Sequence, residues 1–254
     1  MEKLSNLHIK GDWIQEYEAA LEILWHQSVR MDSDMYILEK IAKFPFGLFA
    51  PPNPIFWTLI ADALYSNIIM IAWRILGDTG SDVLTLRKLK NKMLKNARSE
   101  TSRRFILDRL KGANFDVRVK RSIKLIKQVR NDWLAHFKED VVRSAHAKQH
   151  GMPIISANHL VSLRDATNDL ITALSLDSGR AHTFLEYSDD VIRPDGMDPR
   201  SDIEMLLDLI AQNSSLFRMP EDQIEFWPCY RQGLSAENLA VLNSYRKKFG
   251  LSEV

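Results

Sequence analysis

Three side chains within two helical turns could act together on a phosphate ester. Arg130, Asn131 and His136 supply a permanent cation, an amide and an imidazole, the one group of the three that titrates near neutral pH. An arginine can hold a phosphate through charge-assisted hydrogen bonds, and a histidine can take up a proton or return one. The types and spacing of these residues therefore predict a site for phosphate chemistry.

The place of Arg130 in its helix supports this prediction. A helical pattern that begins near residue 115 or 116 puts Arg130 on a stripe of apolar residues, namely Val119, Ile123, Ile126, Trp133 and Phe137. On an ideal helix His136 lies about 120° around the axis from Arg130 and roughly 9 Å further along. An arginine on an apolar stripe is costly unless it is paired or opens on a cavity. We therefore interpret Arg130 as a functional residue.

A purely structural explanation of the same residues stays open. In that explanation Arg130 pairs with a buried acid such as Asp62, and His136 caps its helix at the C-terminal end, where the helix dipole favours a histidine. Two further histidines, His146 and His150, have a spacing that can hold a metal, but without a carboxylate or cysteine close by we interpret them as loop or helix-end residues. We expect no metal site and no cofactor.

Basic residues are concentrated directly before the motif. Residues 87–130 hold sixteen lysines and arginines against three acids, although the formal net charge of the whole chain is only +1. Binding to a nucleic-acid backbone needs such a patch, because much of the affinity comes from neutralising phosphates and releasing counterions. The candidate nucleic-acid-binding residues are Arg87, Lys88, Arg121, Lys124 and Lys127. The alternative is a pair of solvated, lysine-rich helices without a ligand.

Composition predicts an all-α protein. Glycine and proline are scarce, with 10 and 9 among 254 residues, and apolar residues recur mostly at helical spacing. The hydrophobic fraction of 45% suffices for one large domain or for a domain with an appendage. The single cysteine, Cys229, excludes an intramolecular disulfide and suits a reducing, cytoplasmic location. Residues 1–12 are too polar for a signal peptide.

Helix start and stop signals divide the chain into segments. We expect helices over residues 12–43, 54–76, 86–97, 101–111, 115 or 116 to about 137, 156–176, 201–212 and 235–249. Gly112 is expected to end the fourth of these helices. We predict a bundle of long antiparallel helices over residues 1–177 and a smaller extension of helices and loops over residues 178–254.

The stretch 55–76 is mostly apolar and close to the roughly 20 residues that a membrane-spanning helix requires. Asp62 lies near its middle, however, and a central aspartate costs about 2.5–3.5 kcal/mol on insertion scales. We therefore expect a buried central helix and no membrane contact. Tryptophans on the apolar seams are interpreted as core residues: Trp13, Trp25, Trp57 and Trp73.

The motif and its surroundings resemble a known family. Arg130 and Asn131, followed after a short spacer by Ala135 and His136, are similar to the Arg-x(4–6)-His signature of the HEPN superfamily. Upstream, the run Trp73-Arg74-Ile75-Leu76-Gly77-Asp78, a short loop and then Leu84-Thr85-Leu86-Arg87-Lys88-Leu89 resemble the branch related to the abortive-infection protein AbiU2. The resemblance covers residues 12–176 and leaves the C-terminal residues unmatched.

The resemblance implies a HEPN-like helical bundle and a metal-independent endoribonuclease, a toxin or antiphage effector that acts as a homodimer with its two motifs facing one cleft. Arg130 would bind the scissile phosphate of RNA, and His136 would act as general base or acid on the 2′-hydroxyl or the leaving oxygen. Asn131 would orient the histidine or the phosphate. The expected product is a 2′,3′-cyclic phosphate, and an antitoxin protein is a further candidate partner.

Alternatives from other functional classes stay open. Some family toxins carry a tyrosine two residues after the histidine that an antitoxin modifies, and here that position is Lys138, which puts such control in doubt. Some HEPN proteins have lost catalysis, so the main alternative is a non-catalytic helical module that binds RNA, a nucleotide or a protein. A purely structural helical dimer is the third hypothesis.

Overall fold

The computed structural model describes residues 3–49, 55–77, 80–131, 155–177, 201–214, 216 and 232–253. Within these ranges every regular element is a helix, and one isolated bridge joins Ile9 to Ala97. The predicted all-α fold is thereby confirmed. Two compact units form, one from Met1–Met35 and Leu64–Glu186 and the other from Tyr36–Ala63 and Tyr187–Val254.

The borders between the units fall inside two helices. Helix α2 (Ile14–Lys43) and helix α4 (Ile55–Ala72) each contribute one part to the first unit and another to the second. The domain division predicted from the sequence, 1–177 and 178–254, stays a prediction, and the compact units cut the chain at different places.

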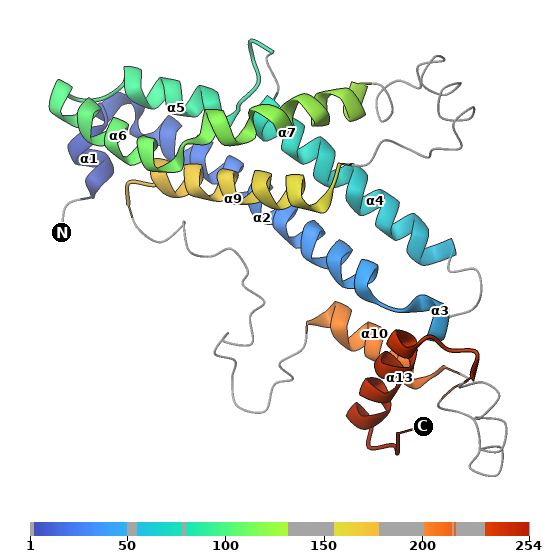
Figure 1. Ribbon diagram of the computed structural model, residues 1–254. Coiled ribbons are helices and arrows are strands. Elements are labelled where there is room, and N and C mark those ends of the chain that lie inside the picture. Colours follow the sequence, from blue (N-terminus) through green and yellow to red (C-terminus); the bar gives the residue numbers. More distant parts are fainter. Residues whose placement is uncertain are drawn as a thin grey trace. The chain divides into compact units, whose positions relative to one another are not determined.

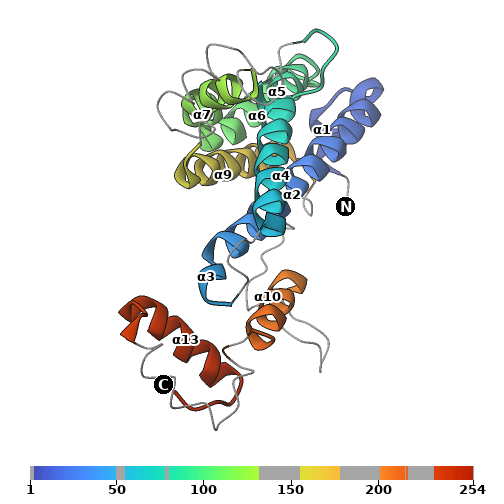
Figure 2. The same cartoon turned by 90° about the vertical axis from the view of Figure 1, so that its right-hand side faces the viewer.

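The first unit is built around helix α9 (Ala157–Leu174), which packs against α6 (Glu100–Ala113) and α7 (Phe115–Val129), as both views show (Figures 1 and 2). The unit also holds α1 (Leu4–His8), the short turn η1 (Gly11–Trp13), η2 (Trp73–Gly77) and α5 (Leu86–Lys95). Leu163, Leu170 and Leu174 recur along one face of α9 and are almost completely buried. This apolar stripe is what the helical periodicity predicts for a central helix.

The helices of the first unit begin where the sequence places a capping side chain. The hydroxyl of Thr85 accepts a hydrogen bond from the backbone N–H of Lys88 at 3.2 Å, and Ser99 accepts one from Ser102 at 3.1 Å. These caps satisfy backbone donors that have no partner inside the helix.

The predicted end of α6 at Gly112 is wrong. The helix includes Gly112 and ends at Ala113, and the capping residue that follows, Asn114, has a φ of 42° in the left-handed region. Asparagine is one of the few residues with a side chain that tolerates this region, so it can end a helix as glycine does. Because α7 begins at Phe115, the same residue also provides the turn between the two helices.

The C-terminal end of α9 is held by two side chains from other helices. The guanidinium of Arg109 donates hydrogen bonds to the carbonyl oxygens of Thr172, Ala173 and Ser175 at 2.9–3.1 Å. The hydroxyl of Tyr17 donates to the carbonyl oxygen of Leu174 at 2.5 Å, and burial raises the pKa of Tyr17 to about 12. These bonds satisfy carbonyl groups that a helix end leaves open.

The apolar stretch Ile55–Gly77 is buried along only one part of its length. From Tyr65 onward most of its side chains are buried, but Ile55, Phe56 and Leu59 are 67%, 63% and 62% exposed. The expectation of a buried central helix is therefore wrong for the N-terminal part, where Asp62 is exposed as well. By length and composition alone this stretch would suffice to cross a membrane.

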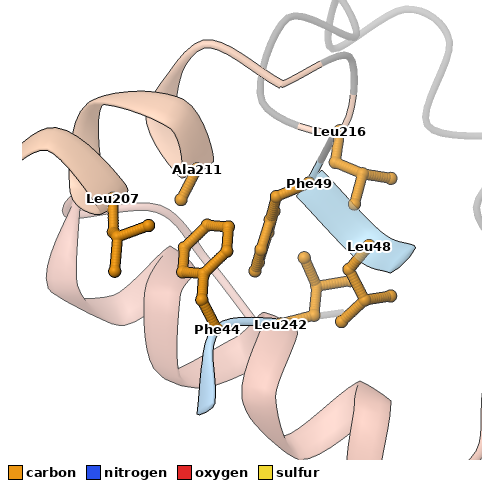
Figure 3. Packing of buried hydrophobic residues seen from close by; sticks show 7 residues of the cluster. All are labelled: Phe44, Leu48, Phe49, Leu207, Ala211, Leu216 and Leu242. Atoms are coloured by element: carbon orange, nitrogen blue, oxygen red, sulfur yellow. The ribbon is translucent and has the colours of Figure 1, made fainter. Parts of the chain in front are cut away.

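The second unit has a small apolar core of its own (Figure 3). Phe44, at the end of α2, and Leu48 and Phe49, in α3 (Phe46–Phe49), pack against α10 (Asp202–Gln212) and α13 (Ala236–Lys248). The buried partners from the C-terminal residues are Leu207, Ala211, Leu216 and Leu242. Both α10 and α13 have the bounds that the sequence predicted to within one residue.

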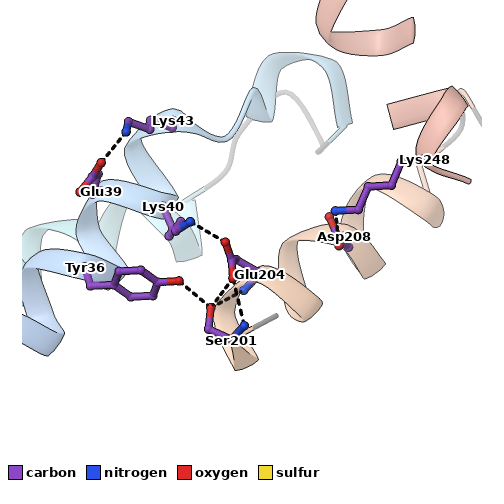
Figure 4. A network of polar contacts seen from close by, with 8 residues as sticks. All are labelled: Tyr36, Glu39, Lys40, Lys43, Ser201, Glu204, Asp208 and Lys248. Carbon is purple, nitrogen blue, oxygen red and sulfur yellow. Dashed lines mark hydrogen bonds and ion pairs between the residues drawn. The ribbon is translucent and has the colours of Figure 1, made fainter. Parts of the chain in front are cut away.

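A polar network ties α2 to the first turn of α10 within this unit (Figure 4). The ammonium of Lys40 lies 2.5 Å from a carboxylate oxygen of Glu204, and Ser201 and Glu204 form a reciprocal capping box. The hydroxyl groups of Tyr36 and Ser201 share a hydrogen bond of 2.9 Å. Burial alone would raise the pKa of Glu204, but the bonds from Lys40 and Ser201 outweigh it and lower the pKa to about 2.

Replacing Glu204 with glutamine should lower the free energy of unfolding by about 1 kcal/mol at pH 7, a value that allows for solvent screening of a partly exposed pair. Since the folded-state pKa lies below the ordinary value of 4.5, the stabilisation is complete above about pH 4.5 and declines as the pH falls toward 2. Urea denaturation at pH 7 and pH 3 tests this, with Glu39→Gln as the control because the Glu39–Lys43 pair is more exposed. An equal loss at both pH values would contradict the expected role of the charge.

Candidate phosphate-binding site

The buried face of α7 leads directly to Arg130. Val119, Ser122, Ile126 and Val129 are buried on this face, and the helix continues through Arg130 and Asn131 as a wider π-helical turn. The backbone N–H of Arg130 donates to the carbonyl oxygens of Ile126 and Lys127, which keeps the residue within the helix. The side chain of Arg130 is half-buried at the end of this mostly apolar face.

The guanidinium of Arg130 has two neighbours among the described residues. Its Nη1 donates a hydrogen bond to Oδ1 of Asn131 at 2.8 Å, and its central carbon lies 5.6 Å from the centre of the Trp73 ring. Its Nε is buried and has no hydrogen-bond partner within the described part of the chain. Asp62, which the structural alternative offered as an example of a buried acid, is an exposed residue.

Trp73 opens a π-helical turn, η2, at the end of α4. The tryptophan is only 8% exposed, and its ring lies directly against Gly77, where an added Cβ would come within 2.5 Å of ring atom Cε3. Turns of this type are rare and are frequent at functional sites. The fold therefore brings together two motifs that lie far apart in the sequence, Trp73–Gly77 and Arg130–Asn131.

The third predicted site residue, His136, lies outside the described residues, as do His146 and His150. The described chain stops at Asn131 and resumes at Ile155, whose backbone N–H donates to the hydroxyl of Tyr65 at 2.7 Å. Tyr65 and Trp73 belong to consecutive helical segments, eight residues apart. Arg130 and Ile155, on either side of the segment that carries His136, therefore both contact the same stretch of the chain.

The outer face of α7 carries a row of cations without partners. Lys120, Arg121, Lys124 and Lys127 are exposed, and among the described residues none of them has an ion pair or a side-chain hydrogen bond. They recur at helical spacing opposite the buried face and lead toward Arg130. We call these four residues the α7 cation row.

Four cations of α5, in contrast to the α7 cation row, have partners within the protein. Arg87 and Lys90 both pair with Asp116, and Lys92 pairs with Glu16 at 2.7 Å. The ammonium of Lys88 donates to the carbonyl oxygens of Gly80, Ser81 and Val83, so it closes the loop before its own helix. Of the five predicted nucleic-acid-binding residues, Arg121, Lys124 and Lys127 are thus open to a ligand, whereas Arg87 and Lys88 are engaged within the protein.

Sequence reasoning missed two residues of this region. Lys120 belongs to the α7 cation row, and its spacing of four residues from Lys124 was the signal that could have found it. Trp73 is buried, as a core residue should be, but its ring also supports Arg130. The signal was Gly77 one turn later, a residue small enough for a large ring to lie against it.

In chemical terms the described part of the chain offers a guanidinium that is not paired with a carboxylate and a row of exposed cations on one helix. Both features suit a ligand with several phosphate groups, because charge-assisted hydrogen bonds from arginine and lysine are the usual means of holding them. The AbiU2 family model (HEPN_AbiU2) matches residues 14–193. No curated protein and no solved structure matches the chain.

Proposed function

Because the chain belongs to the AbiU2 family of HEPN proteins, we propose that it is a metal-independent endoribonuclease that acts in abortive infection, as a toxin or antiphage effector. The observation that carries the proposal is the guanidinium of Arg130, which is half-buried and has no carboxylate partner among the described residues, at the end of the helix that presents the α7 cation row. A strand of RNA carries a series of phosphates that could pair with these cations.

In this proposal Arg130 binds the scissile phosphate and stabilises the negative charge that grows on its oxygens as the bond to the attacking oxygen forms. The amide oxygen of Asn131 accepts from Nη1 of Arg130 and so orients the guanidinium. The α7 cation row neutralises neighbouring phosphates and holds the strand in register.

His136 is the proposed proton-transfer group. As general base it takes the proton from the RNA 2′-hydroxyl, whose oxygen attacks the adjacent phosphorus, and the bond from phosphorus to the 5′-oxygen breaks. His136 then returns this proton to the leaving 5′-oxygen, so the products are a 2′,3′-cyclic phosphate and a 5′-hydroxyl end. A homodimer would supply a second copy of the motif to the same cleft, and we propose that the active form is this dimer.

Cleavage of RNA by the purified protein in EDTA tests the proposal. Wild-type protein should release fragments that end in a 2′,3′-cyclic phosphate, and His136→Ala should lower the rate by about 10²–10⁴-fold. His26→Ala is the control, since His26 is an exposed histidine of α2. Cleavage that His136→Ala leaves intact would assign the activity to other residues or to another protein in the preparation.

Neutralising the α7 cation row should weaken RNA binding and make it less dependent on salt. For single-stranded RNA the plot of log affinity against log salt has a negative slope. This slope should become less steep by about 0.7 for each phosphate that a cation of the protein no longer neutralises. Binding is measured in the His136→Ala background so that the RNA stays intact. The variant carries glutamine at the four positions of the row: Lys120, Arg121, Lys124 and Lys127.

The matched control removes the same number of charges from cations that are already paired. It carries glutamine at Arg87, Lys90, Lys92 and Arg118, whose carboxylate partners are Asp116, Glu16 and Asp169. Its affinity for RNA should change less than that of the row variant. Equal losses in both variants would mean that net charge, and not the α7 cation row, determines binding.

A non-catalytic RNA-binding module is the second candidate function. The α7 cation row favours it, because this surface would hold a phosphate backbone whether or not His136 takes part in chemistry. Salt-dependent binding without turnover, unaffected by His136→Ala, would support this function over the first.

A further inference from the structure

Arg130 is held by neutral groups. Among the described residues its contacts are the amide oxygen of Asn131 and the ring of Trp73, and no carboxylate pairs with it. Two other arginines of the same unit, Arg87 and Arg118, each pair with an aspartate instead. A carboxylate would position the guanidinium but would also cancel its charge and occupy its donors.

An aromatic ring positions a cation at no such cost. The face of a tryptophan attracts a guanidinium through the ring quadrupole, and this contact uses none of the N–H donors in the guanidinium plane. The distance of 5.6 Å from the guanidinium carbon to the ring centre is within the range of this interaction. Among the described residues nothing cancels the charge of Arg130, which therefore remains available to an anion.

The ring of Trp73 is itself fixed in place. It is 8% exposed and lies in the π-helical turn against Gly77, so close that any side chain at residue 77 would displace it. A fixed ring restricts a side chain that otherwise has many rotamers, which is what a charge-stabilising group requires before the reaction begins.

We propose that Trp73 is the positioning residue for Arg130, and that the ring, Gly77 and Asn131 together hold the guanidinium in place while leaving it fully charged for one phosphate group of the substrate. The catalytic part of this inference rests on the proposed ribonuclease function. The structural part, a guanidinium held on the tryptophan ring, concerns the free protein and can be tested without any activity.

The structural part is tested by NMR of the full chain labelled with ¹⁵N-arginine. The Nε–H signal of Arg130, assigned by its loss in Arg130→Lys, should be shifted upfield by the ring current and should exchange slowly with water. Trp73→Leu should abolish the shift, and Trp73→Phe should retain part of it. An Nε–H signal of Arg130 at the ordinary position in the wild-type protein would overturn the proposal, whatever the variants do.

The catalytic part is tested by the kinetics of RNA cleavage. Trp73→Leu should lower kcat by about tenfold with little change in KM, and Trp73→Phe should stay within a few-fold of the wild type. In the Arg130→Ala background, Trp73→Leu should have no further effect, because a positioning residue acts only through the group that it positions. Equal losses from Trp73→Leu with and without Arg130 would overturn the positioning role.

The two parts can fail separately from the proposed function. If the wild-type protein does not cleave RNA but the Nε–H shift is present, the ribonuclease proposal fails and the contact between Trp73 and Arg130 stands. If RNA is cleaved and the shift is absent, the ribonuclease proposal stands and the positioning role of Trp73 is overturned. Thermal unfolding of each variant distinguishes a folded protein without the ring contact from an unfolded one, and Trp73→Phe keeps the test valid if Trp73→Leu does not fold.

Discussion

Arg130→Ala should lower the rate of RNA cleavage by about 10²–10³-fold, the usual loss when a donor to a developing negative charge is removed. The fold should survive, since the side chain is half-buried and its hydrogen bond goes to the neighbouring Asn131. Most of the effect is expected on kcat, because a group that stabilises the charge formed in the transition state contributes less to binding of the ground state.

Arg130→Lys refines this prediction. Lysine keeps the positive charge but has no planar guanidinium to lie on the ring of Trp73 or to donate two parallel hydrogen bonds to a phosphate. It should therefore recover only a small part of the lost rate. Arg121→Ala, on the exposed face of α7, is the control and should weaken RNA binding with little effect on kcat. Full activity of Arg130→Ala would exclude this residue from the chemistry.

Gly77→Ala is the second substitution with a large expected effect. The added Cβ would lie 2.5 Å from Cε3 and 2.7 Å from Cζ3 of Trp73, and the buried ring can move away only by disturbing its packing. Overpacking of this kind costs about 1–3 kcal/mol. The free energy of unfolding should fall by that amount, and RNA cleavage should fall too, because the displaced ring no longer supports Arg130.

Gly112→Ala is the matched control for that measurement. Gly112 lies inside α6, has no positive φ, and would present a Cβ to open space. Alanine is the better helix former, so this change should raise the free energy of unfolding by about 0.4–1 kcal/mol and leave cleavage unchanged. A stable, fully active Gly77→Ala protein would show that the ring of Trp73 does not need the space beside residue 77.

The starts of the helices could be predicted because their causes are local. Four hydroxyl residues each directly precede a helix and accept a hydrogen bond from the backbone N–H three residues later: Thr85, Ser99, Ser201 and Ser235. The end of α6 was harder to predict from local sequence. Gly112 and Asn114 can both end a helix, and which of them does so depends on where the turn into α7 forms.

The state of each cation could not be predicted in the same way. Arg87 and Arg121 look alike in the sequence, yet the first pairs with Asp116, 29 residues away, and the second has no partner among the described residues. Which charges are cancelled depends on how α5 and α7 pack, and composition alone gives only the total. The same holds for the apolar helix α4, where Ile55, Phe56 and Leu59 are exposed although Ile68, Ile69 and Ile71 are buried.

The sequence by itself determined the helical class, most helix bounds and the family, because periodicity, caps and motif spacing are properties of the chain read in order. It also singled out Arg130, a charge on an apolar stripe. Only the tertiary structure decided what surrounds that charge. Arg130 and Trp73 are 57 positions apart in the sequence. Their contact depends on how α7 packs beside η2, and local sequence does not specify that packing.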